Sequence, residues 1–250
     1  MKDNFCSINV ILDASGSMAP ITNDTVGGFN KFLEDQKAEK GEAVLSLTIF
    51  NTEAKVVHDC VPINSVPPLN GKTYNCNGGT ALFDAVGMTI DKVGEKLAAM
   101  KEEDRPSKVL FIIITDGEEN SSCIMETTET TLQPIFDTTA WYGVVSNIYP
   151  FVINTTSYKQ LKYRLEKLKE MIDHQKAKYN WTFAFLSAQI DAFAAGGSLG
   201  ISKGCTMQWN NNAAGSAAAY SEISESTSTY RNAQNFCSTK DSFFNQNTKK

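Results

Sequence analysis

One stretch of the sequence decides the fold, Ile8-Asn9-Val10-Ile11-Leu12-Asp13-Ala14-Ser15-Gly16-Ser17. Its first half is an apolar run of the kind that forms a buried β-strand. The run ends in a carboxylate, two spaced hydroxyls and Gly16, which permits a tight turn. Carboxylate and hydroxyl oxygens are hard ligands that suit Mg²⁺. Asp and Ser are also common turn formers, so this pattern alone leaves a metal site and a plain turn as alternatives.

Two further segments favour the metal site. The first is Gly78-Gly79-Thr80-Ala81-Leu82-Phe83-Asp84, in which a glycine pair precedes Thr80 at the start of an expected helix. The second is Ile112-Ile113-Ile114-Thr115-Asp116-Gly117-Glu118-Glu119-Asn120, in which another apolar strand ends in Thr-Asp-Gly. Ligands of open α/β sheets bind at the carboxyl ends of the strands, so these polar residues are expected to meet there. A helix N-cap without a metal is the alternative role of Thr80.

Together, the three segments resemble the metal-ion-dependent adhesion site of von Willebrand factor A (vWA) domains in their order and spacing. The resemblance extends over about residues 5–210 and is to compact single-domain members found in bacteria and their viruses. It implies an α/β fold with a doubly wound, Rossmann-like, mostly parallel six-stranded sheet. One antiparallel edge strand and helices on both faces complete the implied fold.

The resemblance also implies a role for each residue of the site. Ser15 and Ser17 would bind the metal directly through their hydroxyls, and Thr80 would bind it directly or through a water. Asp13 and Asp116 would act mainly through ordered water and by orienting the hydroxyls. The ion would be Mg²⁺, with Mn²⁺ or Ca²⁺ as alternatives. Because the direct ligands are neutral, an Asp or Glu of a partner protein could complete the metal shell.

Glu118 and Glu119 complicate this expectation, because they directly follow the Thr-Asp-Gly segment. Negative charge beside the site would oppose an acidic partner. Two alternatives remain for these residues. They could point away from the site, or they could hold a second cation.

Strand-like and helix-like segments alternate along the chain, which is typical of a parallel sheet covered by helices. Strands are expected at 7–13, 44–50, 55–60, 109–114, 181–186 and 206–209, and helices at 22–37, 82–100, 159–178 and 213–231. A tight turn at 51–53 predicts the antiparallel edge strand. The resemblance above then implies a single vWA domain over residues 1–231, and the polar tail 232–250 is expected to be poorly ordered unless a partner holds it.

An insertion interrupts this domain at about residues 123–156, just beyond Asp116. Its segments 141–145 and 148–153 are β-prone and predict a hairpin. The insertion also contains aromatic residues of the type that anchor protein interfaces, Trp141, Tyr142, Tyr149 and Phe151. Two interpretations stay open: a loop that determines which partner binds, and a loop that only packs its aromatic residues on the domain.

Composition excludes several classes of function. The formal net charge of −5 gives no general attraction to nucleic acid or to an anionic membrane. No signal-like segment is found, and no apolar run approaches the ~20 residues of a membrane span. We therefore expect a cytoplasmic location, or a virion-associated one if the source is a phage.

The scattered cysteines contain no C-x-x-C pair and are expected to be free thiols. The oligomeric state is not predicted.

The sequence leaves three candidate functions. A Mg²⁺-dependent protein-binding module with an unidentified partner is favoured. A structural or assembly protein, in which the metal only stabilises the loops, is the alternative. A metal-dependent hydrolase is disfavoured, because neither histidine falls in a metal segment and no G-x-S-x-G or P-loop pattern occurs. The sequence therefore predicts that the protein is not an enzyme.

Overall fold

The computed structural model describes residues 1–131, 155–188, 191–233 and 241–244. Six strands form one sheet in the order β3-β2-β1-β4-β7-β8. Their bounds are β1 Lys2–Asp13, β2 Glu42–Phe50, β3 Ala54–Pro62, β4 Pro106–Thr115, β7 Thr182–Ser187 and β8 Thr206–Gln208. All neighbouring strands are parallel except β2 and β3. The predicted doubly wound sheet with one antiparallel edge strand is confirmed.

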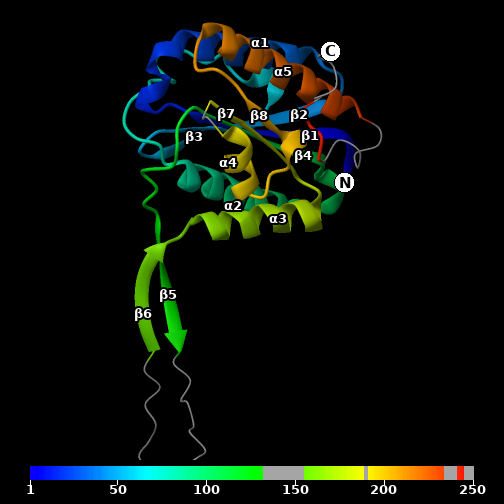
Figure 1. Cartoon of the computed structure of the whole chain (residues 1–250). Coiled ribbons are helices and arrows are strands. Elements are labelled where there is room, and N and C mark those ends of the chain that lie inside the picture. The colour runs from blue at the N-terminus through cyan, green and yellow to red at the C-terminus, as the bar shows by residue number, and fades with distance from the viewer. Residues whose placement is uncertain (132–154, 189–190, 234–240, 245–250) are drawn as a thin grey trace, which may run out of the picture.

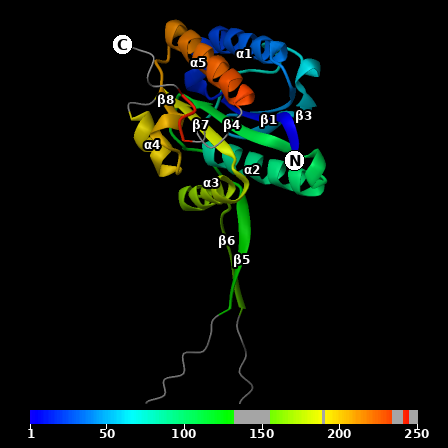
Figure 2. The same ribbon diagram turned by 90° about the vertical axis from the view of Figure 1, so that its right-hand side faces the viewer.

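Helices cover both faces of this sheet (Figures 1 and 2). On one face lie α1 (Thr22–Ala38) and α5 (Ala213–Asn232), side by side, and on the other lie α2 (Leu82–Ala99), α3 (Leu165–Tyr179) and α4 (Ala192–Ser198). Every residue from Val109 to Ile114 in β4 is at most 5% exposed. A central parallel strand is covered on both faces, which explains why this apolar run does not alternate with polar residues.

The helix predicted at 159–178 begins later than expected. Residues Thr155–Leu161 form strand β6, which pairs antiparallel with β5 (Met125–Thr131), and α3 starts only at Leu165. Leu161 is spaced helically from Leu165 and Leu168, yet Leu161 is 38% exposed and Leu168 is completely buried. The prediction was wrong because the leucine spacing continues past the true helix start. The strand that pairs with β6 is β5, at the beginning of the insertion, so no pattern local to β6 reveals the pairing.

Strands β5 and β6 form a two-stranded arm that stands out from the body of the domain (Figure 1). The chain enters the arm at Cys123 and Ile124, whose backbone N–H groups donate to one carboxylate oxygen of Asp84 in α2 at 2.6 and 3.0 Å. The hairpin predicted from segments 141–145 and 148–153 lies outside the described residues. The beginning of the insertion is therefore bound to α2.

The chain also leaves the arm against α2. Asp91 accepts hydrogen bonds from the Lys162 ammonium at 2.8 Å and from the Tyr163 hydroxyl at 2.7 Å. Gly87 makes room for the Tyr163 ring, because a Cβ at Gly87 would lie 2.1 Å from the ring. Residues 84, 87 and 91 share one face of the helix. Both ends of the arm are thus held by the same face of α2.

The described part of the predicted polar tail comprises residues 232–233 and 241–244, and two of these residues join the core. Phe243 and Phe244 are each 4% exposed. The Phe244 N–H donates to the Gly204 carbonyl at 2.9 Å, and the edge of the Phe243 ring meets the Tyr230 ring at a centroid distance of 6.1 Å. These aromatic residues pack against the carboxyl-terminal part of the domain.

Lys108 of β4 is a buried cation that caps the carboxyl end of α5. Its Nζ donates to the carbonyls of Tyr230 at 3.1 Å, Arg231 at 2.6 Å and Ala233 at 2.8 Å. We expect Lys108→Met to lower the free energy of unfolding by about 2–3 kcal/mol, because it removes the donor from three carbonyls. Chemical denaturation measures this change.

Lys2→Met is the matched control for that prediction. Lys2 forms an exposed ion pair with Glu42 at 2.6 Å. Its replacement should lower the free energy of unfolding by less than about 1 kcal/mol, because water already solvates both charges. Equal losses for the two variants would contradict a capping role of Lys108.

Candidate metal centre

Asp13 ends β1 and is completely buried at the carboxyl edge of the sheet. One of its carboxylate oxygens accepts the Ser15 N–H at 2.7 Å, and the other accepts the Thr115 hydroxyl at 2.6 Å. The parallel register pairs Leu12 with Ile114, so Asp13 and Thr115 are neighbours across β1 and β4. Thr115 was not among the predicted site residues, although its place at the strand end is a signal for it.

The hydroxyls of the first loop lead from this buried carboxylate toward solvent. Ser15 is only 2% exposed, and its Oγ lies 3.1 Å from the Oγ of Ser17. Ser17 is exposed and donates from its Oγ to Asp116 Oδ1 at 2.8 Å. Asp116 follows β4, the strand beside β1. A continuous row of oxygen atoms therefore joins the ends of the two central strands.

Gly117 leaves a space beside these oxygens. A Cβ at Gly117 would lie 3.3 Å from Thr80 Oγ1, which is a tight contact, and 3.8 Å from Ser17 Oγ, which is an ordinary van der Waals contact. Hydroxyl and carboxylate oxygens are the ligands that Mg²⁺ prefers. The predicted site residues are thus brought together in a set that fits a hard divalent cation: Asp13, Ser15, Ser17, Thr80 and Asp116.

Hydrogen bonds between the loops hold this arrangement. The Gly16 N–H donates to the Gly78 carbonyl at 3.1 Å, which ties the first loop to the second. The Thr80 N–H donates to Asn120 Oδ1 at 2.8 Å, and the Asn120 N–H donates to the Thr80 carbonyl at 3.0 Å. These contacts tie the second loop to the third. The protein alone therefore orders the three loops around the candidate centre.

The Glu119 carboxylate accepts hydrogen bonds from backbone N–H groups and does not contribute to the candidate centre. Its carboxylate accepts the N–H groups of Phe83 at 2.7 Å, Ser121 at 2.8 Å and Ser122 at 2.7 Å, and the Ser122 hydroxyl at 2.7 Å. Negative charge is favourable at the first turn of a helix such as α2. Glu119 thus stabilises the start of α2, whereas the side chain of Glu118 is exposed.

The electrostatics of the two aspartates favour a cation. Burial raises the pKa of Asp13, although hydrogen bonds from Thr115 and Ser15 act in the opposite direction. Burial raises the pKa of Asp116, the Ser17 hydroxyl lowers it, and the charge of Asp13 adds to the rise. A cation bound among these loops would favour both charged forms. In the described part of the chain, no group of three or more His, Cys, Asp or Glu side chains is arranged to hold a metal ion.

Asn211 reaches the same place from a fourth loop. Its Nδ2 donates to Asp116 Oδ2 at 2.6 Å and more weakly to the Ser17 carbonyl at 3.4 Å. Asn211 was not among the predicted site residues. Its position after β8 is a signal, because the carboxyl end of every parallel strand lies at this edge of the sheet.

The predicted partner-binding residues Trp141, Tyr142, Tyr149 and Phe151 lie outside the described residues. Their role stays a prediction. The described ends of the insertion form the arm, which is continuous in sequence with the loop after Asp116.

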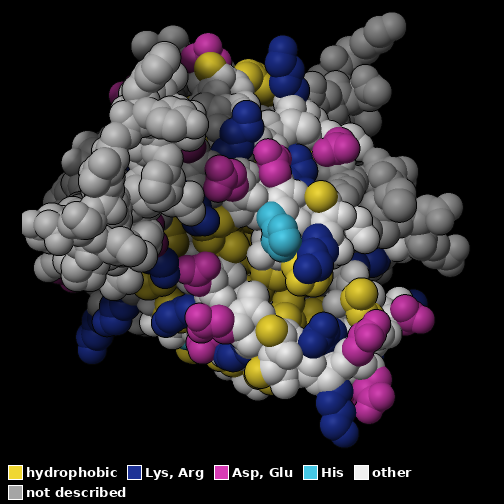
Figure 3. All heavy atoms as spheres, turned by 90° about the horizontal axis from the view of Figure 1, so that it is seen from below, with side chains coloured by type: hydrophobic (Ala, Val, Ile, Leu, Met, Phe, Trp, Pro, Cys, Tyr) yellow, Lys and Arg dark blue, Asp and Glu magenta, His cyan; other side chains and the backbone are white. Residues whose placement is uncertain are grey.

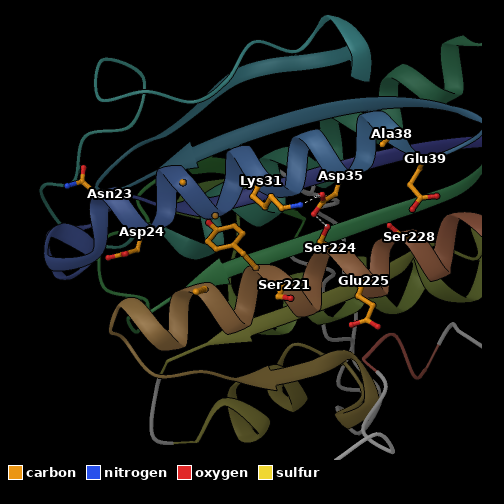
Figure 4. A pocket seen from close by; sticks show the side chains of 14 residues that line it. Asn23, Asp24, Lys31, Asp35, Ala38, Glu39, Ser221, Ser224, Glu225 and Ser228 are labelled. Carbon is orange, nitrogen blue, oxygen red and sulfur yellow. Dashed lines mark hydrogen bonds and ion pairs between the residues drawn. The ribbon is translucent and has the colours of Figure 1, made fainter.

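Two surface grooves lie away from the candidate centre. One, of about 810 Å³, runs between α1 and α5 (Figure 4). Across it, the Ser224 hydroxyl donates to Asp35 at 2.8 Å, and Asp35 also pairs with Lys31, so its polar groups serve helix packing. The other, of about 490 Å³, lies between α2 and α3.

On the face shown in Figure 3, hydrophobic side chains gather in the middle and charges of both signs are mixed around them.

No helix in the described ranges is both long and apolar enough to cross a membrane. A scan of the sequence against protein-family models and a search of curated proteins found no match.

Several solved structures are similar in fold. The pilus adhesin SpaC from Lactobacillus rhamnosus GG matches with a TM-score of 0.52 at 14% identity, over 92% of this chain and 30% of that one. A von Willebrand factor type A protein from Catenulispora acidiphila matches with a TM-score of 0.49 at 13% identity, over 91% and 43%. Proximal thread matrix protein 1 of the mussel byssus, in a structure with a zinc-occupied MIDAS motif, has a TM-score of 0.40 at 12% identity, over 75% and 37%. This chain spans less than half the length of each.

Proposed function

Since the chain has a von Willebrand factor A-like fold, we propose that it is a Mg²⁺-dependent protein-binding module. In this proposal, an Asp or Glu of the partner completes the metal shell. The row of oxygens from Ser15 through Ser17 to Asp116, beside the side-chain-free Gly117, is the observation that carries it. The similarity to a pilus adhesin supports a role in protein binding.

The chemistry of the side chains supports this mode of recognition. Ser15, Ser17 and Thr80 would hold the ion through neutral hydroxyls, with Asp13 and Asp116 orienting them. A bound Mg²⁺ would supply an electrophilic centre that lacks a strong anionic ligand from the chain itself. Because Ser17 is exposed, a carboxylate from another molecule can approach on its side.

We further propose that the protein is not an enzyme. His58 lies in strand β3, and His174 lies in α3 with its ring against Tyr179. Neither histidine belongs to the loops that carry the centre, so no histidine base is supplied there.

Mg²⁺ is expected to stabilise the fold. An ion that binds only the native chain raises the free energy of unfolding by about 2.7 kcal/mol at 100 times its dissociation constant. For a domain of this size, that corresponds to a rise in melting temperature of roughly 5–10 °C. Thermal unfolding in millimolar Mg²⁺ and in EDTA measures the difference. An identical melting temperature in both would count against the metal centre.

The protein-binding function is tested by a pull-down with wild type and Asp13→Ala. Proteins captured by the wild type in Mg²⁺ should be absent in EDTA and absent with the variant in Mg²⁺. The melting temperature of Asp13→Ala has to be measured alongside, because Asp13 also bonds Ser15 and Thr115. Specific capture that persists in both cases would refute a metal-dependent partner.

An assembly role is the second candidate, and the arm is the observation that favours it. The arm stands out from the domain, with both of its ends held by α2 (Figure 2). In an assembly protein the metal would only stabilise the loops, and contacts would be made through the arm. Partner binding that survives EDTA but is lost with the arm would select this role.

A further inference from the structure

We propose that Asn211 is a positioning residue of the metal centre, whose amide holds the Asp116 carboxylate in the orientation that metal binding requires. The inference rests on the proposed metal centre and adds a fourth loop to it. Sequence motifs identify three loops. The first follows β1, the second precedes α2, and the third follows β4. The fourth loop, between β8 and α5, is joined to them through Asn211.

Two side chains from different loops hold the two oxygens of Asp116. The Ser17 hydroxyl donates to Oδ1 at 2.8 Å, and the Asn211 amide donates to Oδ2 at 2.6 Å. A carboxylate bonded at both oxygens cannot rotate about its terminal torsion without breaking one of the bonds. If Asn211 were lost, the Ser17 hydroxyl would be left to restrain this rotation through one carboxylate oxygen.

Asn211 is itself presented by an ordered turn. The Trp209 N–H donates to the Ser187 carbonyl at 3.1 Å, and the Asn212 N–H donates to the Asn210 carbonyl at 2.7 Å. The Asn212 side chain then caps α5 by accepting the Gly215 N–H at 2.8 Å. The residues on both sides of Asn211 are therefore fixed to β7 and α5, and its exposed side chain points across to Asp116.

The side-chain type also suits the role. An amide offers N–H donors without a net charge. A carboxylate at this position would repel Asp116, and an ammonium would compete with the metal for it. Asn is thus able to orient Asp116 while leaving the negative charge of the centre unchanged.

The test compares Asn211→Ala with Asn210→Ala, a neighbouring asparagine that contributes its backbone carbonyl to the turn. Isothermal titration with Mg²⁺, repeated with Mn²⁺, measures the dissociation constant, and thermal unfolding in EDTA measures the fold. Loss of a residue that orients a metal ligand typically lowers metal affinity by about 10–100-fold. We expect that loss for Asn211→Ala alone, with both variants unfolding in EDTA at the temperature of the wild type.

The outcomes separate this inference from the function on which it rests. Wild-type binding with equal affinities for Asn211→Ala and Asn210→Ala would overturn the role of Asn211 and leave the metal centre standing. A lower melting temperature of Asn211→Ala in EDTA, with unchanged affinity, would mean that Asn211 only joins loops, and it also overturns the inference. No binding by the wild type would overturn the metal centre and the inference together.

Discussion

Replacement of Ser15 and Ser17 together by Ala is expected to abolish Mg²⁺ binding without unfolding the chain. Both hydroxyls lie in the row of oxygens beside Gly117, so the change removes two of the proposed direct ligands. The loss should exceed the roughly 10–100-fold that removal of an outer partner causes. Asp13 keeps its bonds to the Ser15 backbone and to Thr115, because neither involves a serine hydroxyl. Isothermal titration measures the binding, and thermal unfolding in EDTA measures the fold.

Ser198→Ala is the control for this double variant. Ser198 is exposed at the end of α4, and its hydroxyl donates to the Ala195 carbonyl of the same helix at 2.7 Å. This variant should bind Mg²⁺ as the wild type does. Wild-type affinity in the double variant would show that the ligands are wrongly assigned.

Removal of the arm is expected to abolish partner binding while the domain stays folded and binds Mg²⁺. Metal completion by a carboxylate gives little selectivity, because every protein surface carries acids, so the surrounding surface has to select the partner. The structure indicates where to cut. Residues 126–160 can be replaced by a short Gly/Ser linker, since Met125 and Leu161 are paired directly across the arm. This cut retains the contacts of Asp84 and Asp91 with the two ends of the arm.

Three measurements on the shortened chain decide the result: cooperative thermal unfolding, Mg²⁺ affinity and capture of the proteins that wild type retains. The Ser15→Ala plus Ser17→Ala variant is the matched comparison, because it should also lose partner binding although its arm is intact. Retained capture by the shortened chain would contradict a selective role of the insertion. A chain that no longer unfolds cooperatively would show that residues of the insertion belong to the core.

The elements of the main sheet could be predicted because each carries its signal locally. The apolar run of β4 predicts a strand buried on both faces. The helical spacing of apolar residues from Leu82 to Val93 predicts α2, in which these apolar side chains are buried. Strand β6 carries no such signal. It is polar, and it is defined by pairing with β5 across the insertion. Local periodicity therefore placed the start of α3 too early.

The residues of the candidate centre were also accessible from the sequence, since Asp13, Ser15, Ser17, Thr80 and Asp116 stand at strand and helix ends in short motifs. Glu119 shows the limit. The sequence left open whether it points away from the site or holds a second cation, and only the fold reveals that it caps α2 through Phe83. Asn211 shows the same limit: its position after β8 places it at this edge of the sheet, but its contact with Asp116 depends on the return of β8 to the sheet.

The sequence by itself determined the parallel sheet and the oxygen-rich loops, because hydrophobic runs and turn residues act over a few neighbouring positions. Only the tertiary structure decided which backbone groups Glu119 caps, that Asn211 holds Asp116, and that α2 binds both ends of the arm. These contacts join residues that are far apart in the chain. Their existence depends on the order in which strands enter the sheet, and that order is set by the packing of the whole domain.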